Sequence, residues 1–176
     1  MKILFLTWFS LLALNTAQAQ TPASPKRLDE VTQRGRQVMP FNLEQTQHVF
    51  NKTAHGGIQQ VVAKQQTDAL QIQLIRQHLS AISQAFQRGD FTAQRQIHGN
   101  DMPGLADMQQ AYAQIAFVYR ELPNGAEIEY SSEASVLVDA IHRYFNAQLS
   151  DHAGHAHTSD PEHCEHHSST TVQTKE

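Results

Sequence analysis

Residues 45–51 and 58–64 alternate hydrophobic and polar positions on either side of Gly56-Gly57. A period of two indicates β-strands, and paired glycines supply the positive φ that a tight turn needs. The pattern therefore predicts a β-hairpin in which His48 and Phe50 share one face of the first strand.

The clearest strand pattern lies further along the chain, in residues 113–121 and 126–131. Pro123-Asn124-Gly125 separates these two runs and is typical of a turn. Glu127 and Glu129 fall together on one face of the second run, so we expect that face to meet water. The pattern predicts a second hairpin.

Two longer stretches, residues 68–88 and 135–149, repeat apolar side chains at spacings of three and four. Such spacing draws one apolar stripe along an α-helix. The stripes consist of Ile72, Ile75, Leu79, Ile82 and Phe86 in the first helix and of Leu137, Ile141, Tyr144 and Phe145 in the second. Between them, Asp101 followed by Pro103 predicts the start of a short helix that runs through Met108.

These elements follow one another in the order ββα(α)ββα, which predicts an α+β fold. We expect a four-stranded, mostly antiparallel sheet with the two long helices packed on one face. The domain is expected to span residues 41–150, after a polar lead-in at 20–40. Residues 151–176 contain too few apolar side chains to fold alone, which predicts a disordered, His-rich tail.

Residues 1–19 have the organisation of a secretory signal peptide. Lys2 provides the positive charge, residues 3–14 form the apolar run, and Ala17-Gln18-Ala19 is a small-x-small cleavage motif. The alternative is an uncleaved membrane anchor, although the apolar run is short for a membrane span. We therefore expect a periplasmic or secreted protein with no stable membrane insertion after cleavage.

Histidine is the unusual residue in the composition, with 11 copies against a single cysteine, Cys164. One cysteine excludes an intramolecular disulfide framework. The formal net charge of −4 lacks the basic excess typical of nucleic-acid binding. Gly-x-Ser-x-Gly, His-Glu-x-x-His and phosphate-binding glycine loops are all missing from the sequence. Metal binding is the chemistry that the histidines favour.

Four histidines and one methionine inside the predicted domain are candidates for an ordered metal site. They lie beside a core face or on the loop before the short helix: His48, His78, His98, Met102 and His142. Imidazole and thioether suit copper, and imidazole also suits zinc. Haem with axial histidine or methionine is less favoured, and the absence of Cys-x-x-Cys-His excludes its covalent attachment. Alternatively, each histidine is a hydrogen-bonding residue at the edge of the core.

The tail offers a second set of metal ligands without a fixed geometry. Its imidazoles and one thiol are His152, His155, His157, His163, Cys164, His166 and His167. A flexible segment can wrap such ligands around an ion, and the thiolate adds affinity for copper(I). The tail therefore predicts a low-selectivity sink for copper or divalent ions, unless it is only a solvated extension.

A set of short motifs spread over residues 39–153 is specific when taken together. The motifs are Met39-Pro40-Phe41-Asn42-Leu43, His48-Val49-Phe50, Gly56-Gly57-Ile58-Gln59-Gln60-Val61-Val62, Leu74-Ile75-Arg76-Gln77-His78-Leu79, Gly89-Asp90-Phe91, Ile97-His98-Gly99, Met102-Pro103-Gly104-Leu105 and Ile141-His142-Arg143. In these motifs the chain resembles a family of small exported bacterial proteins that often carry the name aspartate carbamoyltransferase. That name implies carbamoyl transfer, whereas the chain is shorter than such enzymes and has no Ser-Thr-Arg-Thr phosphate loop.

The function that these observations favour is a periplasmic metal-binding protein acting in metal tolerance, buffering or delivery. Copper is the first expected ion and zinc the second, and no particular protein partner is indicated. One alternative is an enzyme that uses a histidine-bound metal or haem, or the carbamoyltransferase that the family name implies. Another is a non-catalytic binding module whose histidines are structural.

Overall fold

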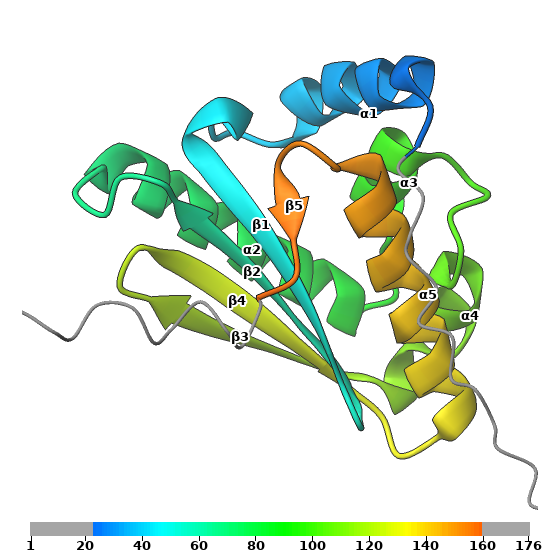
Figure 1. The fold of residues 1–176 in the computed structure, drawn as a ribbon. Helices are drawn as coiled ribbons and strands as arrows, with labels where there is room; N and C mark the ends of the chain where they lie inside the picture. The colour runs from blue at the N-terminus through cyan, green and yellow to red at the C-terminus, as the bar shows by residue number, and fades with distance from the viewer. Residues whose placement is uncertain (1–22, 160–176) are drawn as a thin grey trace, which may run out of the picture.

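The two predicted hairpins form, and they pair with each other in one sheet (Figure 1). The structure is a computed structural model, and it describes residues 23–159. The strands are β1 (Thr46–Thr53), β2 (Gly56–Ala63), β3 (Ala116–Leu122), β4 (Gly125–Ser131) and β5 (Ala156–His157), in the spatial order β3-β4-β2-β1-β5. All neighbouring pairs are antiparallel except β5, which runs parallel to β1.

The two predicted long helices, α2 (Ala69–Gln87) and α5 (Ser135–Asp151), pack side by side on one face of the sheet (Figure 1). Their apolar stripes join the side chains of that sheet face in one core. Ile75 and Leu79 of α2 and Ile141 and Phe145 of α5 are almost completely buried. The 3.6-residue spacing in the sequence therefore identified the correct face of both helices.

The sheet and the helix layer are larger than predicted. The four-strand expectation is wrong in this detail, because the short parallel strand β5 extends the sheet at β1. The helix layer contains the predicted short helix as α4 (Leu105–Gln110), and it also contains α1 (Pro25–Val38) and α3 (Thr92–His98), with 3₁₀ turns at Leu43–Gln45 and Tyr112–Gln114. Mixed α+β architecture is confirmed; the number of elements is not.

The folded unit extends past the expected boundaries, residues 41 and 150, on both sides. Helix α1 begins where Ser24 accepts a hydrogen bond from the Arg27 backbone N–H and Pro25 occupies the first turn. Its Val31 is fully buried, and the helix packs on α3 and α5. At the other end, residues 151–157 continue α5 and return along β1. Helix α1 packs an apolar side chain against the domain, and residues 151–157 pair their backbone with β1. The polar composition of the two segments gives no sign of these contacts.

The glycines of the first hairpin serve a different purpose from the one predicted. Thr53 pairs with Gly56, so the turn itself is Ala54-His55. Gly56 does have a positive φ of 146°, and a side chain there would collide with the backbone of Tyr130. A side chain at Gly57 would collide with the Phe145 ring. These glycines allow β4 and α5 to approach β2 closely.

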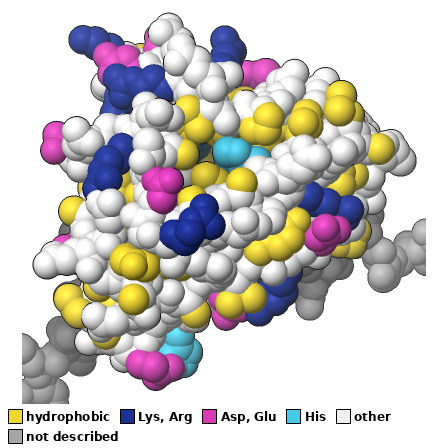
Figure 2. Space-filling view, turned by 180° about the vertical axis from the view of Figure 1, so that it is seen from behind, with side chains coloured by type: hydrophobic (Ala, Val, Ile, Leu, Met, Phe, Trp, Pro, Cys, Tyr) yellow, Lys and Arg dark blue, Asp and Glu magenta, His cyan; other side chains and the backbone are white. Residues whose placement is uncertain are grey.

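One end of the helix–sheet interface is built from aromatic rings. Phe86 stacks on Phe91 at 4.3 Å between ring centroids, and Tyr130 contacts Phe117 and Phe145 edge to face. The other end of the same interface holds histidines. Figure 2 shows the molecule from behind, where a histidine side chain is visible in a recess among hydrophobic ones.

Among residues 23–159, no helix is both long and apolar enough to cross a membrane. The predicted signal peptide at residues 1–19 lies outside the described residues. The same holds for four tail ligands: His163, Cys164, His166 and His167.

Candidate functional site

Four histidines from distant parts of the chain line one small buried cavity. His48 comes from the middle of β1, His78 from α2, His98 from the last residue of α3, and His152 from the position after α5. The cavity has a volume of about 20 Å³, which is enough for one water molecule or one ion. The rings are close: His152 lies 5.4 Å from His48 and 5.1 Å from His98, measured between centroids.

A thioether and three amides also line the cavity, together with the hydrophobic side chains of Phe41, Val61, Leu79, Ile82 and Ile97. The methionine is Met39, from the segment between α1 and β1, and it is only 7% exposed. The amides are Gln59, Gln94 and Gln148. Tyr130 donates a 2.6 Å hydrogen bond to Gln59 Oε1, and Gln148 Nε2 donates to the Tyr144 oxygen. Buried tyrosines therefore hold the Gln59 and Gln148 amides, and Gln148 donates in turn to Gln94 Oε1.

Burial keeps the cavity histidines neutral near pH 7. Burial, with a smaller effect of neighbouring histidines, lowers the pKa of His48 to about 3, and burial lowers the pKa of His78 to about 4. Burial also lowers the pKa of His152 well below its ordinary value. For His98, the lowering of the pKa by burial outweighs the rise caused by its hydrogen bond to Asp151. Neutral imidazole is the form that binds metal ions.

One polar atom of the cluster has no partner within the described part of the chain. His48 Nδ1 is buried and makes no hydrogen bond. Leaving such a group unpaired costs on the order of 1–3 kcal/mol. A buried polar atom that the fold leaves unsatisfied points to an occupant of the cavity, either an ordered water or an ion.

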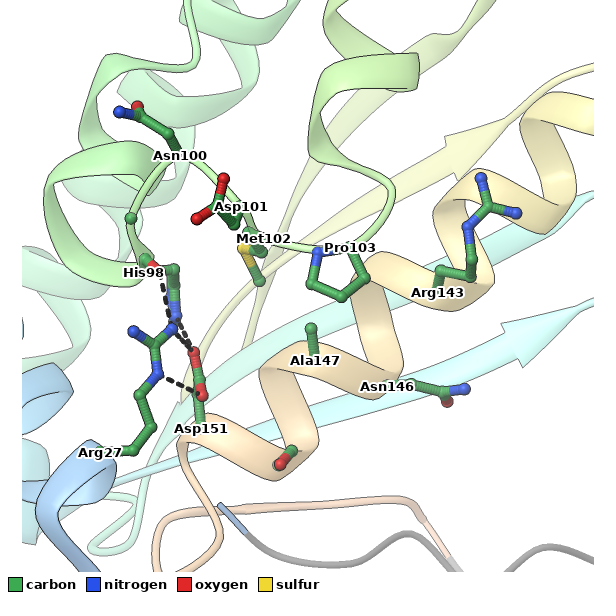
Figure 3. A pocket seen from close by; sticks show the side chains of 12 residues that line it. Arg27, His98, Asn100, Asp101, Met102, Pro103, Arg143, Asn146, Ala147 and Asp151 are labelled. Carbon is green, nitrogen blue, oxygen red and sulfur yellow. Dashed lines mark hydrogen bonds and ion pairs between the residues drawn. The ribbon is translucent and has the colours of Figure 1, made fainter. Parts of the chain in front are cut away.

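His98 is held from the side opposite the cavity by an acid–base pair (Figure 3). Its Nδ1 lies 2.8 Å from Asp151 Oδ2, and Arg27 binds both oxygens of Asp151 at 3.0 and 2.6 Å. Arg27 also donates a 2.7 Å hydrogen bond to the His98 carbonyl. Burial alone would raise the pKa of Asp151, but the hydrogen bonds from His98 and Arg27 lower it to about 2. The carboxylate is thus ionised, and Nε2 is the imidazole nitrogen left for other partners.

An open pocket of about 650 Å³ lies on the far side of His98. We call it the outer pocket; its lining is Arg27, His98, Gly99, Asn100, Asp101, Met102, Pro103, Arg143, Asn146, Ala147, Ser150 and Asp151. Figure 3 shows the loop that carries His98, Asp101 and Met102 on one side of the pocket and α5 with Ala147 and Asp151 on the other. Of all the residues that line either space, His98 alone lines both.

The structure brings three of the five predicted internal ligands together. His48, His78 and His98 share the cavity, whereas Met102 lines the outer pocket. His142 lies elsewhere: its Nε2 is 3.0 Å from the Thr53 carbonyl and 2.9 Å from the Gly56 carbonyl. It therefore holds α5 to the first hairpin, in agreement with the alternative reading of a boundary histidine.

The predicted tail ligands separate into three groups. His152 belongs to the cavity and is 8% exposed. The backbone carbonyl of His155 accepts a hydrogen bond from His48 of β1, its Nε2 lies 3.5 Å from Glu44, and its buried Nδ1 has no partner among residues 23–159. His157 is exposed on β5. The remaining four lie outside the described residues. Residues 151–157 are thus an ordered part of the structure.

Sequence reasoning missed Met39, Arg27 and Asp151, and it assigned His152 to a disordered tail instead of to the folded domain. Met39 opens the first of the shared motifs, so that motif was a usable signal. Arg27 and Asp151 are 124 positions apart and neither lies in a recognisable motif. Only the folded chain shows that they meet.

Within residues 23–159, no group of three or more His, Cys, Asp or Glu side chains is placed so that it could hold a metal ion. The planes of His48 and His152 are nearly parallel, at 2° to each other, so the two rings are stacked. A site at the cavity would therefore need imidazoles in other rotamers, or would combine fewer of them with the Met39 thioether.

Comparison of the chain with protein-family models, with curated proteins and with solved structures finds no match. The resemblance noted from the motifs therefore stays a prediction, and any function must be argued from the site itself.

Proposed function

We propose that this protein binds a single copper ion, in the copper(I) state, at the buried histidine cavity, and that it serves in copper buffering or delivery outside the cytoplasm. Zinc is the second candidate ion. The periplasmic or secreted location belongs to the proposal, because it rests on the amino-terminal sequence alone.

The observation that carries the proposal is the unpaired Nδ1 of His48 at the wall of a cavity with room for one ion. Hydrophobic residues of similar size would avoid the cost of burying four imidazoles. Imidazoles and a thioether form the donor set that selects copper among the common biological metals. Met39 adds the soft ligand that zinc does not need.

The hydrogen bonds of His98 support a ligand role for this residue. Metal-binding histidines commonly donate their second ring N–H to a carboxylate, which fixes the tautomer and makes the free nitrogen a better donor. Asp151 occupies this position at Nδ1, and Arg27 fixes Asp151 in turn. The arrangement leaves His98 Nε2 as the donor at the cavity.

The size of the cavity argues against the other cofactor considered. A space of about 20 Å³ cannot contain a haem between the histidines. A bound ion requires only that one or two imidazoles turn about their side-chain bonds. Two imidazoles and one thioether would be a sufficient ligand set for copper(I). Such a set contains only two histidines, so it does not need a group of three or more His, Cys, Asp or Glu side chains.

The test is a copper(I) titration of the mature chain against a chromogenic copper(I) chelator, under anaerobic conditions. The tail ligands are first removed by His163→Ala, Cys164→Ser, His166→Ala and His167→Ala in one chain, here named the tail-silenced chain. We expect it to bind one ion, and we expect His48→Leu and His152→Ala each to weaken binding by about 100-fold or more.

The matched control is His55→Ala, which removes an exposed histidine at the turn of the first hairpin. This variant should bind copper as tightly as the tail-silenced chain. The proposal fails if the tail-silenced chain binds no ion, or if the cavity variants and the control bind equally well. Circular dichroism of each variant separates lost binding from lost folding.

A further inference from the structure

The two edges of the sheet are protected unequally (Figure 1). One edge is β5, which is two residues long, and so short a strand offers little backbone to another chain. The other edge is β3, which is seven residues long, and no strand within residues 23–159 pairs with its outer side. β3 is therefore the edge at which another strand can extend the sheet.

The backbone groups on the outer side of β3 belong to every second residue. The turn that joins β3 to β4 is two residues long, so Leu122 and Gly125 form a hydrogen-bonded pair across the hairpin. In an antiparallel hairpin such pairs alternate with pairs whose N–H and C=O groups point away from the partner strand. Those of Phe117, Tyr119 and Glu121 therefore point outward, away from β4.

Side chains of α2 cover one end of this outer edge. The Phe117 carbonyl accepts hydrogen bonds from Ser83 Oγ at 3.1 Å and from Gln87 Nε2 at 2.7 Å. These contacts agree with the outward direction of the carbonyl. Tyr119 is the next outward-pointing residue, so its N–H and C=O lie at the centre of the open part of the edge.

The two charged side chains of β3 are already paired within the chain. Charges on an edge strand ordinarily discourage pairing with other strands. The guanidinium of Arg120, however, lies 2.6 Å from Glu129 and 3.3 Å from Glu127, both on β4, so it points across the sheet. Glu121 lies 3.1 Å from Arg76 of α2. Neither charge stands alone at the edge to repel a second strand.

We propose that β3 pairs antiparallel with β3 of a second copy of this chain, around a twofold axis at Tyr119. The two sheets then join into one continuous sheet. A twofold contact uses the same surface on both copies, and an antiparallel edge strand is complementary to itself in this way. The inference goes beyond the proposed function and does not depend on it, because no residue of the histidine cavity takes part.

The side chains of β3 favour this register over its neighbours. With Tyr119 opposite its own copy, Val118 lies opposite Arg120 of the second copy, and no like charges face each other. A register centred on Arg120 would place two guanidinium groups directly opposite, which is unfavourable. A register centred on Val118 would need the Phe117 carbonyl, which α2 already occupies, for its central hydrogen bonds. A shift by a single residue would put side chains on the wrong face of the sheet.

The experiment is sedimentation equilibrium of the tail-silenced chain in the presence of EDTA. Under these conditions neither a Cys164 disulfide nor a metal ion shared between tails can link two chains. The interface is small, so we expect a weak dimer whose apparent mass rises from one chain toward two between micromolar and millimolar concentration. Tyr119→Pro removes the central outward N–H, at an edge position where proline is tolerated, and should abolish the dimer.

Charge variants at Val118, which is 41% exposed, test the contact with Arg120 of the second copy. Val118→Lys places two positive charges opposite each other at two symmetric positions and should weaken dimerisation by about tenfold. Val118→Glu should dimerise at least as tightly as the tail-silenced chain, which a simple loss of apolar contact would not give. Val136→Lys is the matched control on α5, where Val136 is 65% exposed, and should change nothing.

A cross-link tests the register, because the tail-silenced chain contains no cysteine. Tyr119→Cys places two thiols on residues whose Cα atoms lie about 5.5 Å apart in a hydrogen-bonded pair, so mild oxidation should give a covalent dimer. In Val118→Cys the two thiols are offset by about 7 Å along the strand alone, which is too far for a disulfide. This variant should stay uncross-linked.

A chain that stays monomeric up to millimolar concentration would overturn the proposal and leave the edge to a strand of another protein. A dimer that persists in Tyr119→Pro, with circular dichroism showing that the variant is folded, would lie elsewhere on the molecule and would also overturn it. Cross-linking of Val118→Cys in place of Tyr119→Cys would overturn the register around Tyr119.

Discussion

The two ends of the helix–sheet interface are built on the same sheet face and under the same two helices, yet their chemistry is opposite. At one end Phe86, Phe91, Phe117, Tyr130 and Phe145 form a network of ring contacts. At the other end the same layers enclose His48, His78, His98 and His152. The aromatic end follows the ordinary rule for a stable core, and the histidine end departs from it.

The two ends of the interface contribute differently to the stability of the domain. Burying an aromatic ring stabilises the fold without any partner, whereas a buried imidazole stabilises it only when its ring nitrogens are paired. Because His48 leaves one nitrogen unpaired among the described residues, the histidine end contributes less stability than the aromatic end. Departures from an apolar core that have no local compensation are the places where function is expected.

The largest predicted effect is at the aromatic end. Phe86→Ala removes a ring that is 1% exposed and contacts Phe91, Phe117 and Tyr130. We expect the free energy of unfolding to fall by about 3–5 kcal/mol, measured by urea denaturation. Val118→Ala on the exposed sheet face is the control and should change it by less than about 1 kcal/mol. A loss at Phe86 as small as the control's would show that this end is not the stabilising one.

Acidification should act on the histidine end alone. Unfolded histidines take up protons below about pH 6.5, whereas folded His48 and His78 stay neutral down to pKa values of about 3 and 4. Stability is therefore full above pH 6.5 and falls by about 1.4 kcal/mol per pH unit and per histidine below it. Asp151, with its pKa lowered to about 2, keeps its contribution throughout this range.

The free energy of unfolding should thus drop by about 2–4 kcal/mol between pH 7 and pH 5. Urea denaturation at these two pH values and at pH 6 measures the slope. His78→Leu should make the slope shallower, and Phe117→Leu should leave it unchanged. A free energy of unfolding that is flat over this range would contradict neutral burial of the two rings.

Copper binding should stabilise the histidine end of the helix–sheet interface and leave the aromatic end unaffected. At 100 times its dissociation constant, a ligand that binds only the folded state adds about 2.7 kcal/mol to the free energy of unfolding. The tail-silenced chain and its Phe117→Leu variant should both show this gain in copper-containing urea titrations. His152→Ala should show none, and an equal gain in all three would move the copper site away from the cavity.

The smallest expected change in the free energy of unfolding is at His48, and it distinguishes a binding residue from a structural one. His48→Leu replaces a ring that has an unpaired nitrogen by an apolar side chain of similar volume. Without metal, we expect the free energy of unfolding to stay within about 1 kcal/mol of the original value, because the lost contacts are offset by the removed desolvation cost. A loss of more than about 2 kcal/mol would show that His48 is an ordinary structural residue.

The sequence predicted the elements with a strong period and missed those without one. Both hairpins and both long helices were recognisable because their apolar side chains, such as Ile75, Leu79 and Phe117, are placed at regular spacings. Strand β5 is two residues long and contains no β-branched side chain, so its pairing with β1 has no local signal. A short helix over residues 28–38 is compatible with the sequence, but the charged residues of α1 (Pro25–Val38) hide the packing of the fully buried Val31.

The site was predictable in residue type and not in geometry. A position on the flank of an apolar stripe selected His78, which lines the cavity, and also His142, whose ring bonds backbone carbonyls instead. A position on a loop before a helix selected His98, which also lines the cavity. His152 lay in a polar segment, where composition predicts disorder rather than burial. Spacing along one element cannot show which side chains of different elements meet, and the pair Arg27–Asp151 depends entirely on such a meeting.

The contact between Arg27 and Asp151 also fixes when the site can exist during the life of the chain. The two residues lie 124 positions apart, close to opposite ends of the folded unit. A ribosome adds the residues of α5 and β5 only after every other wall of the cavity has been made. A nascent chain therefore has no closed cavity, and under the proposed function it would acquire its ion only after the chain is complete.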